Sequence, residues 1–191
     1  MAELTKRERV YAEQVRQLYR LSRPAHVGAL VNSSILVFAL WGVVSVTLLG
    51  AWLCAMFMVT GARYLLYRAY NGLKPPDHEA ARWARYFVAG AGTAGLLWGV
   101  AGSVLYPVAS LPHQFLVIFL IGGMTMAAMV ILAAVPIAFF AFMLPALGLM
   151  LVTVFMQGST LHLYMGALMI VYVLVLISIV PIVANMMREG L

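Results

Sequence analysis

One stretch of the chain has the letters of a nucleotide-binding loop. Gly90, Gly92 and Gly95 match the G-x-G-x-x-G fingerprint of dinucleotide-binding proteins. That fingerprint acts where a strand meets a helix N-terminus, because free N–H groups there bind phosphate. Here the glycines lie inside a long apolar segment, where a helix already uses those N–H groups. We therefore interpret Gly92, Gly95, Gly99 and Gly102 as a small-residue stripe for helix packing, inside one bundle rather than at a dimer seam.

The four histidines offer metal-binding or pH-sensing chemistry. His113 and His162 are expected at the outer ends of two membrane spans, and His26 and His78 on the cytoplasmic side. Two outer histidines without a carboxylate are too few for a closed zinc site. Ordinary hydrogen bonding at the membrane interface is therefore favoured over a metal site or a pH sensor.

Thirteen methionines invite a copper hypothesis, because thioethers are soft ligands for Cu(I). On a helix, however, Met124 and Met126 point about 200° apart and cannot share an ion. Methionine also fills irregular gaps in apolar packing, which is its more frequent role. We predict no metal site and no cofactor.

A polar cluster interrupts an apolar segment at Asn32, Ser33 and Ser34. Its default role is hydrogen bonding between helices, and a ligand-binding role for Asn32 stays open. We hypothesise a ligand pocket formed by Asn32, Trp98 and His113. No nucleophile elbow, phosphate loop or zinc signature is present, so we expect no catalytic residues and no enzyme activity in this chain.

The solvent around these residues follows from the distribution of charge. From Tyr86 to Met187 the chain runs 102 residues without Asp, Glu, Lys or Arg. It is 64% hydrophobic and 9% charged, against about 45–50% and about 25% in soluble domains. Surfaces in water need charge, so these segments are expected to face lipid.

The predicted fold is an all-α integral membrane protein with six transmembrane helices, each of about 20 apolar residues. The predicted spans are about 26–44, 47–68, 86–106, 112–134, 136–156 and 161–187. They form one bundle over 25–187. A basic amphipathic helix is expected within 1–24, ending at a break at Pro24, and 188–191 is expected to start a cytoplasmic signalling helix that the chain cuts short.

Basic residues set the predicted orientation. Six precede the first span, five lie at the end of the second span or in the loop after it, and one follows the sixth span. The loops near Ser45, Ala109 and Ser159 carry none, so the positive-inside rule places both termini in the cytoplasm. Arg63 and Arg68 are expected to snorkel at the cytoplasmic end of their span. The net charge of +6 thus indicates a membrane surface and not nucleic acid.

Three features at the cytoplasmic side have expected local roles. The apolar face of the amphipathic segment is expected to lie in the lipid interface, with packing on a cytoplasmic partner or second protomer as the alternative. Asp77 is expected to be the N-cap of a short helix before the third span. Pro181 is expected to kink the sixth span and to take part in signal transmission.

Several motifs occur in a characteristic order: Glu13-Gln14-Val15-Arg16-Gln17-Leu18-Tyr19, Arg82-Trp83-Ala84-Arg85, Gly95-Leu96-Leu97-Trp98-Gly99, His113-Gln114 and Leu144-Pro145-Ala146. From about Glu13 to Met187 the chain resembles the N-terminal six-helix membrane sensor region of bacterial multidomain signalling proteins. Their cytoplasmic parts are histidine kinases, or diguanylate cyclases and phosphodiesterases with PAS domains. The resemblance implies an input module in the bacterial inner membrane, a homodimer, and a fused cytoplasmic output domain.

The function expected from these observations is a sensory and anchoring module. A stimulus would repack the bundle, and the sixth helix would pass the change to the output domain. Because the outer loops are short, the stimulus is expected to be apolar or a property of the membrane. A small transporter or channel is an alternative, although spans without central charges disfavour it. A passive membrane scaffold is the third hypothesis.

Overall fold

The computed structural model describes residues 6–189, and this part of the chain is all-helical. Residues 1–5 of the expected amphipathic helix and 190–191 of the expected signalling helix lie outside the described residues. A single turn of 3-10 helix, η1 (Asp77–Glu79), precedes the third of the long helices. The six α-helices are α1 (Lys6–Ala39), α2 (Val46–Leu73), α3 (Ala80–Ala101), α4 (Leu111–Leu132), α5 (Pro136–Met156) and α6 (Thr160–Glu189).

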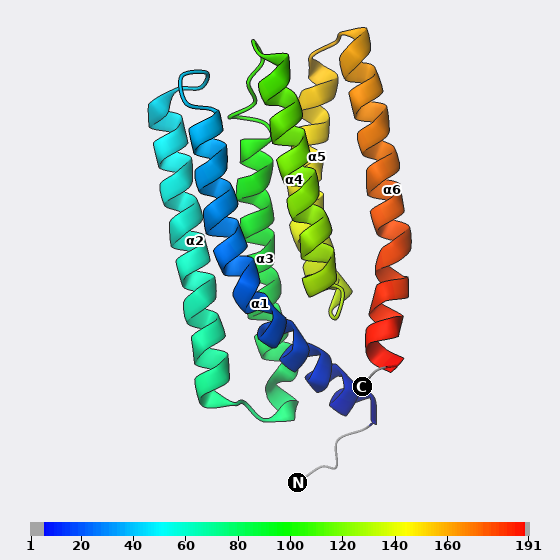
Figure 1. Cartoon of the computed structure of the whole chain (residues 1–191). Coiled ribbons are helices and arrows are strands. Elements are labelled where there is room, and N and C mark those ends of the chain that lie inside the picture. Colours follow the sequence, from blue (N-terminus) through cyan, green and yellow to red (C-terminus); the bar gives the residue numbers. More distant parts are fainter. Residues whose placement is uncertain (1–5, 190–191) are drawn as a thin grey trace.

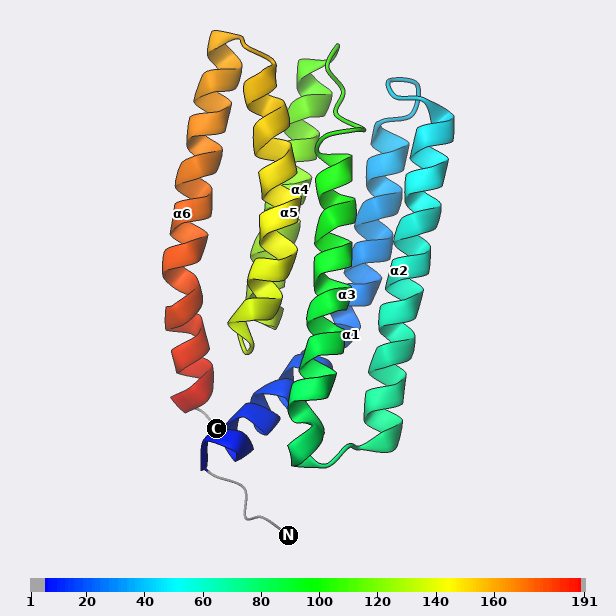
Figure 2. The same cartoon turned by 180° about the vertical axis from the view of Figure 1, so that it is seen from behind.

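The helices stand side by side in one bundle (Figure 1). Seen from behind, α2, α3 and α5 form one layer, α1 and α4 form the other, and α6 lies at the edge beside α5 (Figure 2). The start of α1 and the end of α6 lie at the same end of the bundle, which we call the terminal end. The α2–α3 loop lies at this end too, because the chain leaves it along α1 and returns to it along α2.

Four of the helices, α2, α4, α5 and α6, are long and apolar enough to cross a membrane. Their outward surface is apolar as well, with Phe119 83% exposed. Among the described residues, α1 and α3 do not meet the same requirement of length and composition. The reason for α1 is the charge along its first half. In α3 two arginines, Arg82 and Arg85, and four glycines lower the mean hydropathy. The chain therefore has the helices that a membrane protein needs.

Helix boundaries follow the sequence prediction most closely where proline marks them. α5 occupies the residues predicted for the fifth span, beginning at Pro136, and α4 and α6 differ from prediction by two residues or fewer at each end. α2 continues past the predicted 47–68 to Leu73. α3 ends at Ala101 instead of reaching 106, because the chain turns after this residue.

The predicted break at Pro24 is wrong, because α1 continues through this residue to Ala39. Proline removes one backbone hydrogen bond and bends a helix without ending it when packing holds both halves. Figure 1 shows α1 changing direction along its course, with its darkest part crossing beneath the bundle.

Part of the apolar face of the N-terminal half of α1 packs on the protein itself. Val15, Leu18 and Tyr19 are fully buried there. The Tyr19 ring stacks on Tyr70 with centroids 3.8 Å apart, and its hydroxyl donates a hydrogen bond to the Trp83 carbonyl at 3.0 Å. Burial raises the pKa of the Tyr19 phenol, so this donor stays protonated. The buried part of this face is thus held by the protein's own helices.

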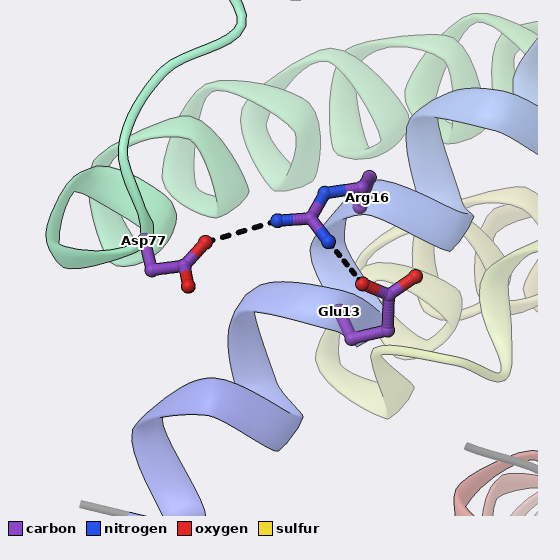
Figure 3. A network of polar contacts seen from close by, with 3 residues as sticks. All are labelled: Glu13, Arg16 and Asp77. Atoms are coloured by element: carbon purple, nitrogen blue, oxygen red, sulfur yellow. Dashed lines mark hydrogen bonds and ion pairs between the residues drawn. The ribbon is translucent and has the colours of Figure 1, made fainter. Parts of the chain in front are cut away.

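An exposed ion-pair cluster connects α1 to the α2–α3 loop (Figure 3). Arg16 pairs with Glu13 on its own helix and with Asp77, whose Oδ1 lies 2.9 Å from Arg16 Nη2. The prediction that Asp77 is an N-cap is wrong. Pro76 holds that position, and Asp77 is the first residue of η1. Exposed pairs contribute about 0–1 kcal/mol, so the cluster orients the loop more than it stabilises the fold.

The small-residue stripe packs α3 against α5, which confirms its predicted role inside the bundle. A Cβ at Gly95 would lie 2.2 Å from the Phe142 carbonyl oxygen, and one at Gly99 would lie 2.2 Å from that of Pro145. No side chain fits at either distance, so glycine is required for the two backbones to touch. At the outer members of the stripe, an added Cβ would lie 2.7 Å from Met150 Cβ at Gly102 and 3.5 Å from the Ala141 oxygen at Gly92.

Candidate functional site

A cavity of about 280 Å³ lies inside the bundle, with walls from five helices, α1 to α5. Most of the lining is apolar. Its polar or aromatic groups include Asn32 from α1, Arg63 from α2, Phe87 and Trp98 from α3, and the thioether of Met124 from α4. We call this space the inner cavity. Two of the three predicted pocket residues, Asn32 and Trp98, are therefore brought together.

Asn32 faces α4 across the inner cavity. Its Nδ2 donates to the Gly28 carbonyl of its own helix at 2.9 Å and lies 3.1 Å from Met124 Sδ. The second contact joins α1 to α4, which is the interhelical bonding expected of this polar cluster. Ser33 and Ser34 instead donate to the Leu30 carbonyl, so the hydrogen bonds of their hydroxyl groups stay within α1.

Trp98 forms a rigid wall of the inner cavity. It is 1% exposed and contacts the edge of Trp52, with ring centroids 5.5 Å apart. The Trp52 Nε1 in turn donates to the Leu97 carbonyl at 2.7 Å, which fixes the neighbouring ring. The two tryptophans thereby hold the α2–α3 wall in one arrangement.

Arg63 is placed differently from the sequence prediction. Instead of snorkelling away from the bundle, it is half-buried and its side chain lines the inner cavity. Its guanidinium carbon lies 5.9 Å from the centroid of the Phe87 ring, within cation–π range. Its stem crosses α3 at Gly90, where an added Cβ would lie 3.1 Å from Arg63 Cγ. Because Gly90 has no side chain, it leaves room for the aliphatic part of Arg63. The glycine-rich motif did not reveal this role.

Arg63 has no carboxylate partner among residues 8–187, whose side chains the structure describes. The two ion pairs described there both belong to Arg16, and the sequence contains no Asp or Glu between Glu79 and Glu189. The guanidinium thus contributes a positive charge to a mostly apolar cavity. An ionisable residue in such surroundings is expensive and is a functional-site candidate.

His113, the third predicted pocket residue, lies elsewhere. It is in the first turn of α4, at the end of the bundle opposite the termini, and its Nδ1 lies 2.6 Å from Ser110 Oγ. His26, expected in the cytoplasm, is buried in α1 with its ring 6.1 Å from that of Tyr64. Neither histidine lines the inner cavity.

A second polar centre, at the end opposite the termini, was not predicted as a unit. Gln114 is buried there, and its Oε1 lies 2.9 Å from His162 Nε2 and accepts a hydrogen bond from the Tyr106 hydroxyl at 3.3 Å. Its Nε2 donates to the Val108 carbonyl at 2.9 Å. His162 also contacts Ser159 at 2.6 Å. These are the ordinary hydrogen bonds expected of His162, and they hold two loops together.

A groove of about 450 Å³ runs between α4 and α6 on the outside of the bundle. Phe115, Phe119, Met165 and Met169 are among its almost entirely apolar lining. Among the side chains that the structure describes, in residues 8–187, no group of three or more His, Cys, Asp or Glu could hold a metal ion. The lining of the groove is thus almost entirely apolar, whereas the inner cavity combines a charged side chain with apolar walls.

Comparison with known proteins finds no matching family model, no matching curated protein and no matching solved structure. The resemblance to bacterial sensor regions stays a prediction from the motifs. The inner cavity is accordingly the feature from which a function is inferred.

Proposed function

We propose that this chain is the sensory and anchoring module of a bacterial signalling protein in the inner membrane. The observation that supports this most is the inner cavity. A passive scaffold gains nothing from Arg63 without a carboxylate partner in its interior, because a charge in apolar surroundings costs free energy. A cavity of this kind is what a ligand-sensing module needs.

The proposed topology has six spans with both ends cytoplasmic. The part of α1 after Pro24 and the whole of α3 lie alongside the four apolar helices (Figures 1 and 2). A membrane around those four would therefore enclose α1 and α3 too, and α3 hides its glycine face against α5. Arg and Lys residues occur at the start of α1, the end of α2 and the start of α3, all at the terminal end. The positive-inside rule places that end in the cytoplasm.

The proposed output path is α6. This helix lies at the edge of the bundle, with α5 and α4 as its main neighbours, and it continues through Pro181 toward the terminal end. A ligand in the inner cavity would favour one packing of α4 and α5, which α6 would report to a fused output domain. The ligand must bind the two packings with different affinity, since equal affinity shifts no equilibrium. We propose further that the protein is a homodimer. Its output domain, after residue 191, would be a histidine kinase or a cyclic-di-GMP enzyme.

The test fills the inner cavity and measures signalling. Gly28 lines the cavity, and a Cβ built there meets no other atom within 4 Å. Gly28→Leu therefore adds apolar volume and improves helix propensity by about 0.8–1 kcal/mol. Gly148→Leu is the matched control, because Gly148 is exposed on α5 with equally open space and lies outside the cavity lining.

Both variants are expressed in the full-length protein, and output is measured with its own kinase or cyclic-di-GMP activity. Gly28→Leu is expected to lock the output and remove its regulation, with membrane levels unchanged. Gly148→Leu is expected to match the wild type. Equal regulation in all three proteins would contradict the sensory role, and a stop codon directly after residue 191 would contradict the fused output domain.

A further inference from the structure

The charge and shape of the inner cavity also indicate the class of its ligand. We infer that it binds an amphiphilic anion, with a carboxylate or phosphate head at Arg63 and an apolar chain beside Trp98. This inference concerns the same site as the sensory proposal and rests on it for its biological meaning. The binding step itself can be measured without any signalling output.

The head-group half of the inference follows from Arg63. This residue lies ten positions before the end of α2 at Leu73, which is about 15 Å along the helix axis. Arg68, on the same helix, is exposed and free to reach solvent. Gly90 makes room for the Arg63 stem and Phe87 receives the guanidinium. The chain thus positions this charge within the bundle while supplying no acidic partner in residues 8–187.

Guanidinium chemistry narrows the head group. Arginine offers five N–H donors in a planar fork that fits carboxylate and phosphate with two parallel hydrogen bonds. The other polar side chains of the lining are already bonded: Ser22 donates to the Tyr19 carbonyl, and Asn32 donates to Gly28. Arg63 is therefore the donor that remains for an anion, whereas a neutral apolar ligand would leave its charge uncompensated.

The apolar half of the inference follows from the remaining walls. Met124, Phe142 and Leu132 line the cavity together with Trp98. A dry cavity of about 150 Å³ holds one benzene molecule. The 280 Å³ available here therefore accommodates roughly ten non-hydrogen atoms on the same scale. A ten-carbon chain is a suitable probe length.

The rim of the inner cavity indicates the route. Pro24 on α1 and Ala127 on α4 line the cavity and are exposed on the outside of the bundle. The opening is thus on the side of the bundle, between two helices that face lipid in the proposed topology. An amphiphile dissolved in the bilayer would reach Arg63 from there without crossing water.

The experiment measures binding of 10-bromodecanoate to the chain in phosphatidylcholine nanodiscs. Bromine quenches tryptophan at short range, so Trp98 reports occupancy, and Trp98→Phe identifies the part of the signal that comes from this ring. The uncharged 10-bromodecanol enters the bilayer at least as well and controls for partitioning. Arg63→Gln is compared with Arg68→Gln, which removes the same charge from the same helix outside the cavity.

Saturable quenching by bromodecanoate is expected for the wild type and for Arg68→Gln. Arg63→Gln is expected to weaken binding of the acid at least tenfold and to leave quenching by the alcohol unchanged. Displacement of bromodecanoate by decanoate alone would identify a free acid as the natural source, and displacement by dihexanoyl phosphatidylglycerol would identify a lipid phosphate. Equal quenching by acid and alcohol, equal behaviour of the two arginine variants, or displacement by neither competitor would overturn the inference.

The two proposals fail separately. Binding that depends on Arg63, together with an output unaffected by Gly28→Leu, would leave an anion site without a sensory role. An output changed by Gly28→Leu, together with no Arg63-dependent binding, would leave a sensory cavity whose ligand is not an amphiphilic anion.

Discussion

The contact between α3 and α5 offers the sharpest test of the packing. Gly95→Ala would place a methyl group 2.2 Å from the Phe142 carbonyl oxygen, more than an ångström closer than ordinary van der Waals contact at 3.4 Å. The obstacle is backbone, which cannot rotate away, so the two helices must separate along the stripe. Overpacking of this kind costs about 1–3 kcal/mol, whereas alanine gains about 0.8–1 kcal/mol of helix propensity over glycine.

The net effect expected for Gly95→Ala is a loss of up to about 2 kcal/mol of unfolding free energy. Gly148→Ala is the matched control on α5, since its Cβ would meet nothing within 4 Å, and it is expected to be neutral or slightly stabilising. Equilibrium unfolding in one detergent, with both variants measured beside the wild type, gives the difference. Equal stability of the two variants would refute the close α3–α5 contact.

Two further predictions concern polar groups at opposite ends of the bundle. Burial raises the pKa of Tyr19 in the folded chain. The stability that this residue contributes is therefore complete below its unfolded pKa of about 10 and declines as pH rises above that value. In a pH series of thermal unfolding, Tyr19→Phe should lose less stability at alkaline pH than the wild type, and an equal loss would contradict this. His162→Ala leaves the buried Gln114 without one partner and should cost about 1–3 kcal/mol. His113 is half-buried and bonded to a nearby serine, so His113→Ala should cost less stability than His162→Ala. A larger loss of thermal stability in His113→Ala would contradict the network.

Sequence alone was sufficient for the features that lipid imposes directly. Long apolar segments must become helices, because unpaired backbone groups are too costly in hydrocarbon. Pro136 marks the start of α5, since proline is tolerated in the first turn of a helix. The glycine stripe was predictable for the same kind of reason: helices in lipid approach closely only where their side chains are small.

Tertiary contacts determined the features that the sequence did not reveal. Pro24 normally ends a helix, but α1 continues because Val15, Leu18 and Tyr19 on one side of it are held by the bundle. The inward course of Arg63 depends on Gly90, 27 positions later in the sequence. Asn32 and Trp98 of the candidate pocket both line the inner cavity. His113 was at a helix end, and so at the wrong depth.

Membrane topology is the most direct test of the central claim that six helices cross the bilayer and return both ends to the cytoplasm. The exposed Cys54 is first replaced by serine. Single cysteines are then placed at Ala109, in the α3–α4 loop, and at Asn71, near the end of α2. A membrane-impermeant thiol reagent applied to intact cells with permeabilised outer membranes should label Ala109→Cys alone, with Asn71→Cys labelled only after lysis. Labelling of both positions from the same side would contradict the six-span bundle.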